Sequence, residues 1–135
     1  MSAKQFTYIP QPECLSQVRE DVNACLEDAG WEERQMDVSL ALGEVLQNII
    51  RYGFEGGSND GTICIDFSAS PDELTLVITD NAPPSDPDLW VTTHRPPEDG
   101  GMGLNLIKAL ASEVRFSMRE DGNQAELKFG KAISA

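Results

Sequence analysis

The stretch EDGGMGLNLIKAL, residues 98–110, places three glycines directly before an apolar segment with helical spacing. These glycines are Gly100, Gly101 and Gly103. Glycine lets a backbone approach a ligand closely, and the first N–H groups of a helix are unpaired and carry partial positive charge. The segment therefore predicts either a loop that must bend or a cradle for an anionic group such as phosphate.

Two common phosphate motifs do not describe these glycines. A Walker A loop ends in Gly-Lys-Ser or Gly-Lys-Thr, and no such triplet occurs in the chain. The dinucleotide pattern GxGxxG needs a strand immediately before it, whereas a polar, proline-rich run from Asn81 to Gly101 precedes these glycines. A run of about twenty residues without a clear element is typical of a functional or a disordered loop in a small domain.

Apolar periodicity predicts the regular elements on both sides of this loop. Before it, we expect a strand at residues 6–9, helices at 13–29 and 33–51, and strands at 62–68 and 73–79. After it, we expect a helix at 104–111 and strands near 114–118 and 125–129, joined by a turn at Asp121-Gly122-Asn123. Hairpins with helices gathered apart from them predict an α+β two-layer sandwich, and one domain spanning residues 1–135.

The chain is strongly acidic, with 23 Asp and Glu against 10 Lys and Arg and a formal net charge of −13. A surface of this sign repels phosphate backbones, which argues against direct nucleic-acid binding. It also repels a nucleotide, so a nucleotide site here needs backbone donors or a cation to overcome the repulsion. A role in solubility alone explains the charge equally well.

The expected location is a reducing cytoplasm. The sequence has no secretory signal and no apolar run long enough to span a membrane. Its three cysteines, Cys14, Cys25 and Cys64, lie far apart and lack CxxC spacing, which argues against a disulfide framework or a zinc site.

The predicted helix at 33–51 carries a second, partly polar stripe that contains Glu44 and Asn48. These two side chains are four residues apart and therefore lie one turn apart on the same side. A carboxamide oxygen can ligate Mg²⁺, and a carboxylate can orient or deprotonate an attacking hydroxyl. A solvated helix face would show the same pattern, so the pair alone does not decide. The stripe comprises Asp37, Ala41, Glu44, Asn48 and Arg51.

Asp80 stands at the end of an apolar strand, where the long loop begins. A carboxylate in this position can accept a hydrogen bond from an exocyclic amine such as that of adenine. An aspartate that initiates a turn before Asn81 and the following prolines is the simpler alternative when the residue is considered alone.

Taken together, these signals resemble the GHKL ATPase superfamily, whose nucleotide fold also occurs in histidine kinases and gyrase. The order is an ExxxN helix, a strand ending in Asp, a long loop, and GGxGL opening a helix. The segments ALGEVLQNIIRYGF (41–54) and GGMGLNLIKALASEVRFSM (100–118) are similar to the small anti-sigma-factor serine/threonine kinases. The resemblance is clearest over residues 38–129 and implies a Bergerat-type fold with a mixed, mostly antiparallel sheet under about three helices.

The resemblance implies a role for each matching residue. Glu44 would be the general base, Asn48 would ligate the Mg²⁺ that bridges the ATP phosphates, and Asp80 would bind the adenine amine. The cofactors would be ATP and Mg²⁺, and the Asn81–Gly100 loop would be the ATP lid. The further nucleotide-binding residues would be Arg51, Ala82, Gly100, Gly101, Met102, Gly103 and Leu104.

The implied function is an ATP-dependent protein serine/threonine kinase that acts as an anti-sigma factor in a partner-switching circuit. Its substrate would be a STAS-type anti-anti-sigma protein, a sigma factor would be a further partner, and a homodimer stays open. Two positions depart from the family pattern: Ala82 stands where a glycine is usual, and Tyr52 stands where a histidine is frequent. The Ala82-Pro83-Pro84 run leaves an alternative, namely a catalytically weak or inactive nucleotide-binding or protein-binding module that sequesters a regulatory partner.

Overall fold

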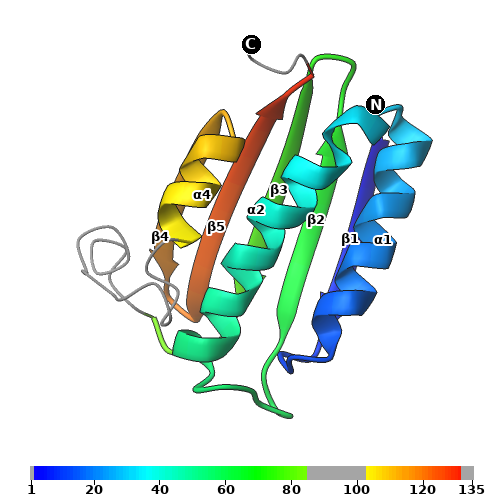
Figure 1. Ribbon diagram of the computed structural model, residues 1–135. Helices are drawn as coiled ribbons and strands as arrows, with labels where there is room; N and C mark the ends of the chain where they lie inside the picture. Colours follow the sequence, from blue (N-terminus) through cyan, green and yellow to red (C-terminus); the bar gives the residue numbers. More distant parts are fainter. Residues whose placement is uncertain (1, 85–102, 132–135) are drawn as a thin grey trace.

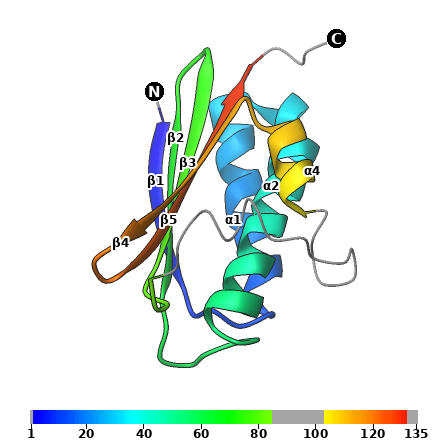
Figure 2. The same cartoon turned by 90° about the vertical axis from the view of Figure 1, so that its left-hand side faces the viewer.

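The structure is a computed structural model that describes residues 2–84 and 103–131. Helices lie on one face of a single sheet, which confirms the α+β two-layer architecture (Figures 1 and 2). The elements are β1 (Ser2–Tyr8), α1 (Cys14–Ala29), the 3-10 turn η1 (Glu32–Arg34), α2 (Gln35–Asn48), the π-helical turn η2 (Ile49–Gly53), β2 (Ile63–Ala69), β3 (Glu73–Asp80), α4 (Gly103–Leu110), β4 (Glu113–Arg119) and β5 (Gly122–Gly130).

The sheet has five strands in the order β1-β2-β3-β5-β4. We expected a mixed, mostly antiparallel sheet, and every pairing among the described strands is antiparallel. The reason is that β2–β3 and β4–β5 are hairpins with short turns, which only antiparallel strands can form. In the central pair, Asp80 of β3 lies directly opposite Asn123 of β5, so the two side chains point to the same face of the sheet.

Alternating apolar side chains build the core between the two layers. On β2, β3 and β5 every second side chain is buried and faces the helices, while α1 and α2 present apolar stripes at helical spacing toward the sheet. Figure 2 shows all the helices on one side of the sheet. The buried strand residues are Ile63, Ile65, Phe67, Ala69, Leu74, Leu76, Ile78, Ala125, Leu127 and Phe129.

The helix predicted at 33–51 consists of three pieces, a 3-10 turn, α2 and a π-helical turn. In the last piece the N–H of Phe54 donates to the C=O of Ile49 at 3.1 Å, which is the i→i+5 bond of a π-helix. The wider turn changes the direction of the side chains that follow Asn48. Helix α1 ends as predicted at Gly30, whose φ of 77° places it in the left-handed region that favours glycine.

The turn predicted at Asp121-Gly122-Asn123 begins one residue earlier and is shorter, at Glu120-Asp121, and Gly122 already pairs with Arg119 in the ladder. A Cβ on Gly122 would lie 1.8 Å from the main-chain oxygen of Asp80. This glycine therefore permits a close approach of β5 to the end of β3, and turn formation is not its role.

The cysteines and the helices bear on two of the sequence-based expectations. Cys14, Cys25 and Cys64 are all free thiols. Within residues 2–84 and 103–131, no helix combines the length and the apolarity needed to cross a bilayer.

Candidate functional site

Asn48, the last residue of α2, is buried at 2% exposure, which is unusual for an amide side chain. Its Nδ2 has no hydrogen-bond partner among the described residues. A buried polar group without a partner costs about 1–3 kcal/mol, so its retention needs an explanation. A ligand held by one end of this amide would supply that explanation, because amide rotation lets either the oxygen or the nitrogen face the ligand.

Glu44 lies one turn before Asn48 on α2 and is half-buried. Within the described parts of the chain it takes part in no ion pair and no hydrogen bond. Side chains four residues apart on a helix lie about 5–6 Å apart at Cβ. The structure therefore presents an acid and an amide, side by side and not engaged by the rest of the described protein.

Asp80, the last residue of β3, is also half-buried and faces the helical layer. Its Oδ1 accepts hydrogen bonds from the backbone N–H of Ala82 at 3.0 Å and from Nδ2 of Asn123 at 3.2 Å. Burial raises the pKa of the Asp80 carboxyl above its ordinary value, although both hydrogen bonds act in the opposite direction. The other oxygen, Oδ2, accepts no hydrogen bond from the described residues and is available to a ligand.

Asn123 is a site residue that the sequence analysis did not find. Its amide donates to Oδ1 of Asp80 and also to the carbonyl oxygen of Pro83, both at 3.2 Å. It thus holds the carboxylate and the beginning of the following segment together. Only the register of the sheet, which pairs Asp80 with Asn123, reveals this role. The register depends on which strands pair, and the local sequence does not show this.

The end of the α2–η2 helix and the residues after Asp80 meet directly. A Cβ on Gly53, the last residue of η2, would lie 3.1 Å from the Cβ of Ala82. Ala82 itself is buried at 1% exposure. The helix that carries Glu44 and Asn48 and the strand that ends in Asp80 therefore converge at the same end of the molecule, which is the lower end in Figure 1.

Helix α4 lies beside α2 and opens at Gly103, with Leu104 next in its backbone. The helix runs opposite to α2, so its N-terminal end points toward the end of α2 that carries Asn48 (Figure 1). Three of the predicted nucleotide residues, Gly100, Gly101 and Met102, lie outside the described residues.

Arg51, a predicted nucleotide-binding residue, lies in the π-helical turn that follows Asn48. Its guanidinium carbon lies 5.9 Å from the centroid of the Tyr52 ring, and its side chain is exposed. Arg51 borders a hollow of about 200 Å³ with Pro12, Leu15 and Gln47, beside the beginning of α1. The π-helical turn after Asn48 accounts for this direction, because it breaks the spacing that would have continued the stripe.

A metal held by the described residues would need further ligands from a bound molecule or water. No cluster of three or more His, Cys, Asp or Glu side chains suited to a metal occurs in residues 2–84 and 103–131. Mg²⁺ commonly binds through few protein ligands, with phosphate oxygens and water completing its shell. The unpartnered Asn48 amide fits such a role, because it supplies one oxygen at a buried position.

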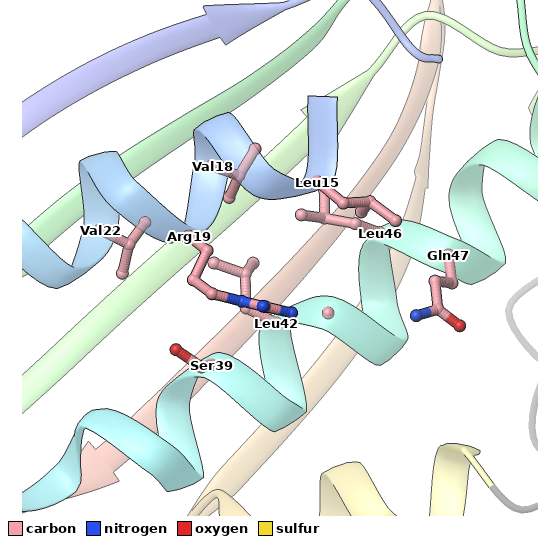
Figure 3. Close-up of a pocket in the computed structure, with 9 residues that line it drawn as sticks. Leu15, Val18, Arg19, Val22, Ser39, Leu42, Leu46 and Gln47 are labelled. Atoms are coloured by element: carbon pink, nitrogen blue, oxygen red, sulfur yellow. The ribbon is translucent and has the colours of Figure 1, made fainter. Parts of the chain in front are cut away.

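A separate groove lies between α1 and α2, on the outer side of the helical layer (Figure 3). It is small, with a volume of about 40 Å³. The Arg19 side chain reaches from α1 toward α2 above Leu42, and Gly43 provides an open stretch of the floor. No described residue forms an ion pair with Arg19. This groove contains neither Glu44 nor Asp80 and is distinct from the candidate site.

Comparison with known sequences gives one family match. The profile described as "Histidine kinase-like ATPase domain" matches residues 9–129, which is most of the chain. No protein with a curated description matches the sequence.

Comparison with solved structures gives the same fold. The RsbU and RsbW domains of Rv1364c from Mycobacterium tuberculosis match with a TM-score of 0.71 and 18% identity, over 96% of this chain and 32% of that one. The chain therefore spans about a third of the length of this relative. The catalytic domain of histidine kinase ThkA matches with a TM-score of 0.59 and 16% identity, over 97% of each chain. A histidine kinase domain from Erythrobacter litoralis matches with a TM-score of 0.56 and 16% identity, over 85% of this chain and 58% of that one.

Proposed function

The chain belongs to the histidine kinase-like ATPase domain family, and from this premise we propose that it is a Mg-ATP-dependent protein serine/threonine kinase and anti-sigma factor. The substrate in this proposal is a STAS-type anti-anti-sigma protein, with a sigma factor as a second partner. The observation that carries the proposal is the buried Asn48 side chain, whose Nδ2 has no partner among the described residues, one turn from Glu44, which pairs with none of them. The family match over residues 9–129 supports one such domain within residues 1–135.

Nucleotide recognition in this proposal uses the end of β3. Asp80 accepts a hydrogen bond from the exocyclic amine of adenine through Oδ2, while Ala82 and Asn123 hold Oδ1. The buried methyl group of Ala82 is small enough to let a flat base approach. The N–H groups that open α4 at Gly103 hold the phosphate end, as helix N-termini do in many anion sites.

Phosphoryl transfer needs mainly positioning and neutralisation of charge. Asn48 would hold a Mg²⁺ ion, which would neutralise charge on the phosphate oxygens. Glu44 accepts the proton of the attacking serine or threonine hydroxyl. A bond forms between that oxygen and the γ-phosphorus, the bond from the γ-phosphorus to the bridging oxygen breaks, and ADP carries away the electron pair. The absence of an ion pair on Glu44 among the described residues supports its role as a base, because no cation holds its proton-accepting oxygens.

The test is phosphorylation of a STAS protein with Mg-ATP, followed by mass spectrometry of the serine and threonine sites. We expect phosphoserine or phosphothreonine with the parent chain, and a rate at least about 100-fold lower with Glu44→Ala, because general-base catalysis contributes on that order. Nucleotide binding should survive in Glu44→Ala. Glu126→Gln, on β5, is the matched control for loss of one carboxylate.

Two outcomes would contradict the proposal in different ways. No phosphorylated product from the parent chain would overturn the kinase function. Equal rates for the parent and Glu44→Ala would show that another group removes the proton.

The groove between α1 and α2 favours a second candidate, a module that binds a partner protein without catalysis. Gly43 lies inside α2, where glycine costs up to about 1 kcal/mol relative to alanine, and a Cβ there would meet nothing within 4 Å. Tight packing of the described residues therefore does not explain this glycine. Arg19 forms no ion pair with a described residue and lies beside an apolar floor, which fits a partner segment that offers one apolar side chain and one carboxylate.

Binding measurements separate the two candidates. If the second is correct, Mg-ATP leaves the melting temperature unchanged at millimolar concentration, while Arg19→Glu weakens capture of the STAS protein. If the kinase proposal is correct, Mg-ATP raises the melting temperature of both the parent and Arg19→Glu.

A further inference from the structure

Arg34, the last residue of η1, is a cation buried at 6% exposure where three elements meet. Its Nη2 donates to the carbonyl oxygen of Leu110 at 3.1 Å, at the C-terminal end of α4. Its Nη1 lies 3.4 Å from Oδ2 of Asp37 in the first turn of α2. Its guanidinium carbon lies 6.0 Å from the centroid of the Phe129 ring on β5. Arg34 therefore joins α2, α4 and β5.

Burying the Arg34 guanidinium costs free energy of hydration, which an apolar side chain in the same place would not lose. A buried charge loses its hydration, and Nε of Arg34 has no partner among the described residues. An apolar side chain of similar length would fill the same space without that cost. What the guanidinium adds is a directed bond to a carbonyl at a helix C-terminus, where a cation is favoured by the helix dipole.

The bond to Leu110 links the C-terminal end of α4 to the residue just before α2. The two helices lie side by side and run in opposite directions (Figures 1 and 2). At 1.5 Å per residue, Gly103 lies roughly 10 Å from Leu110, whereas Glu44 lies roughly 15 Å from Arg34 along α2. The N-terminal end of α4 therefore stops about 5 Å before the level of Glu44 and about 10 Å before that of Asn48, and its N–H groups point toward that end of α2.

We propose that Arg34 is a positioning residue that holds α4 at a fixed height against α2, and so places the N–H groups opening α4 where they meet the phosphates of the bound nucleotide. This inference rests on the proposed function. Helix α4 has eight residues, and a helix of that length is not stable on its own, so its placement depends on its contacts. Arg34 touches no reacting atom, and its effect passes through α4.

Lys131 provides a matched control within the same molecule. Its Nζ donates to the carbonyl oxygen of Gly30 just beyond α1 and lies 4.8 Å from the centroid of the Trp31 ring. It is thus another cation that caps a helix C-terminus. Helix α1 carries none of the proposed nucleotide-binding residues, so loss of this cap should lower stability without altering phosphate binding.

The experiment compares the affinities for ATP and adenosine, both with Mg²⁺, by calorimetry in the parent chain, Arg34→Met, Arg34→Lys and Lys131→Met. The quantity of interest is the ratio of the adenosine Kd to the ATP Kd, which measures the phosphate contribution. Partial unfolding weakens both ligands equally and leaves this ratio unchanged. We expect the ratio to fall about tenfold in Arg34→Met and about threefold in Arg34→Lys, and to stay within about twofold in Lys131→Met.

Hydrogen exchange of the α4 amides gives a second readout that needs no ligand. Arg34→Lys keeps the buried cation and serves if Arg34→Met does not fold. Relative to the parent chain, Arg34→Lys should speed amide exchange more in α4 than in α1. Lys131→Met should speed it more in α1 than in α4. ATP binding with an unchanged affinity ratio in Arg34→Lys and Arg34→Met would overturn the positioning role alone. Absence of ATP binding by the parent chain would overturn the proposed function and this role with it.

Discussion

At the scale of the residue, Asp80 shows a conflict between stability and ligand binding. Its carboxylate loses hydration by burial, and the two hydrogen bonds to Oδ1 only partly compensate, so its pKa is raised in the folded state. Folding therefore favours the protonated form. The stability that Asp80 contributes is present below the ordinary Asp pKa and is lost as the pH rises through the folded-state pKa.

Replacement of Asp80 by Asn should therefore stabilise the protein and weaken nucleotide binding. The amide oxygen can still accept both hydrogen bonds, while the buried charge disappears. At pH 7 we expect Asp80→Asn to melt about 2 °C higher than the parent, and the difference to vanish as the pH falls to about 4. The measurement is thermal unfolding across this pH range, with ATP titrations at pH 7.

Asp72→Asn is the control, because Asp72 is exposed in the turn between β2 and β3. It should leave both the melting temperature and the ATP affinity unchanged. An Asp80→Asn variant that is less stable than the parent at pH 7 would contradict the assigned cost of burial.

Residues of the candidate site differ in how far the sequence could reveal them. Glu44, Asn48 and Asp80 could be proposed because a helical spacing and the end of an apolar strand are local patterns. Asn123 could not, because its partnership with Asp80 arises from the pairing of β3 with β5. Arg34 could not either, because its contact with Leu110 joins residues 76 positions apart.

At the scale of the element, two glycines illustrate opposite constraints. Gly43 lies in α2 with open space above it, whereas Gly122 lies in β5 against the main chain of Asp80. We expect Gly43→Ala to stabilise the protein by about 0.5–1 kcal/mol, because alanine favours the helix. We expect Gly122→Ala to destabilise it by about 2–3 kcal/mol, because the strand must move away.

Urea denaturation of both variants measures this difference in sign. Gly130→Ala is a suitable control for Gly122→Ala, because it also lies in β5 and a Cβ there would meet nothing within 4 Å. If Gly122→Ala kept the stability of the parent, the close approach of β5 to Asp80 would be wrong. Loss of STAS-protein binding in the stabilised Gly43→Ala would support the groove as the partner surface.

Apolar periodicity predicts most of the helices and strands, but it predicts their exact ends and their backbone geometry less well. Helix α1 ends at Gly30 as predicted, and the β2–β3 and β4–β5 hairpins form. The π-helical turn after Asn48 was not predictable, since the apolar Ile49 and Ile50 suit a continuing α-helix equally well. Periodicity reports which face is buried, and it does not report how tightly the backbone is wound.

At the scale of the whole molecule, the net charge of −13 opposes the binding of any triphosphate. The described part of the proposed site offers backbone N–H groups and an amide and, with Arg51 turned onto Tyr52, little positive charge. A divalent cation is therefore the main means of offsetting the repulsion in the proposed function. We therefore expect the affinity for ATP to fall strongly when Mg²⁺ is removed, because the ion offsets the repulsion by the acidic protein as well as binding the phosphates.

This dependence should pass through Asn48. In the parent chain we expect ATP with Mg²⁺ to raise the melting temperature by several degrees more than ATP with EDTA, following the logarithm of saturation. In Asn48→Ala the difference between the two conditions should disappear. Because Nδ2 of Asn48 is buried without a partner among the described residues, its removal should offset part of the cost of the cavity that alanine leaves in the unliganded variant. Gln47→Ala, on the exposed side of the same turn, should keep the full Mg²⁺ effect. A Mg²⁺-dependent shift that survives in Asn48→Ala would remove Asn48 as the metal ligand.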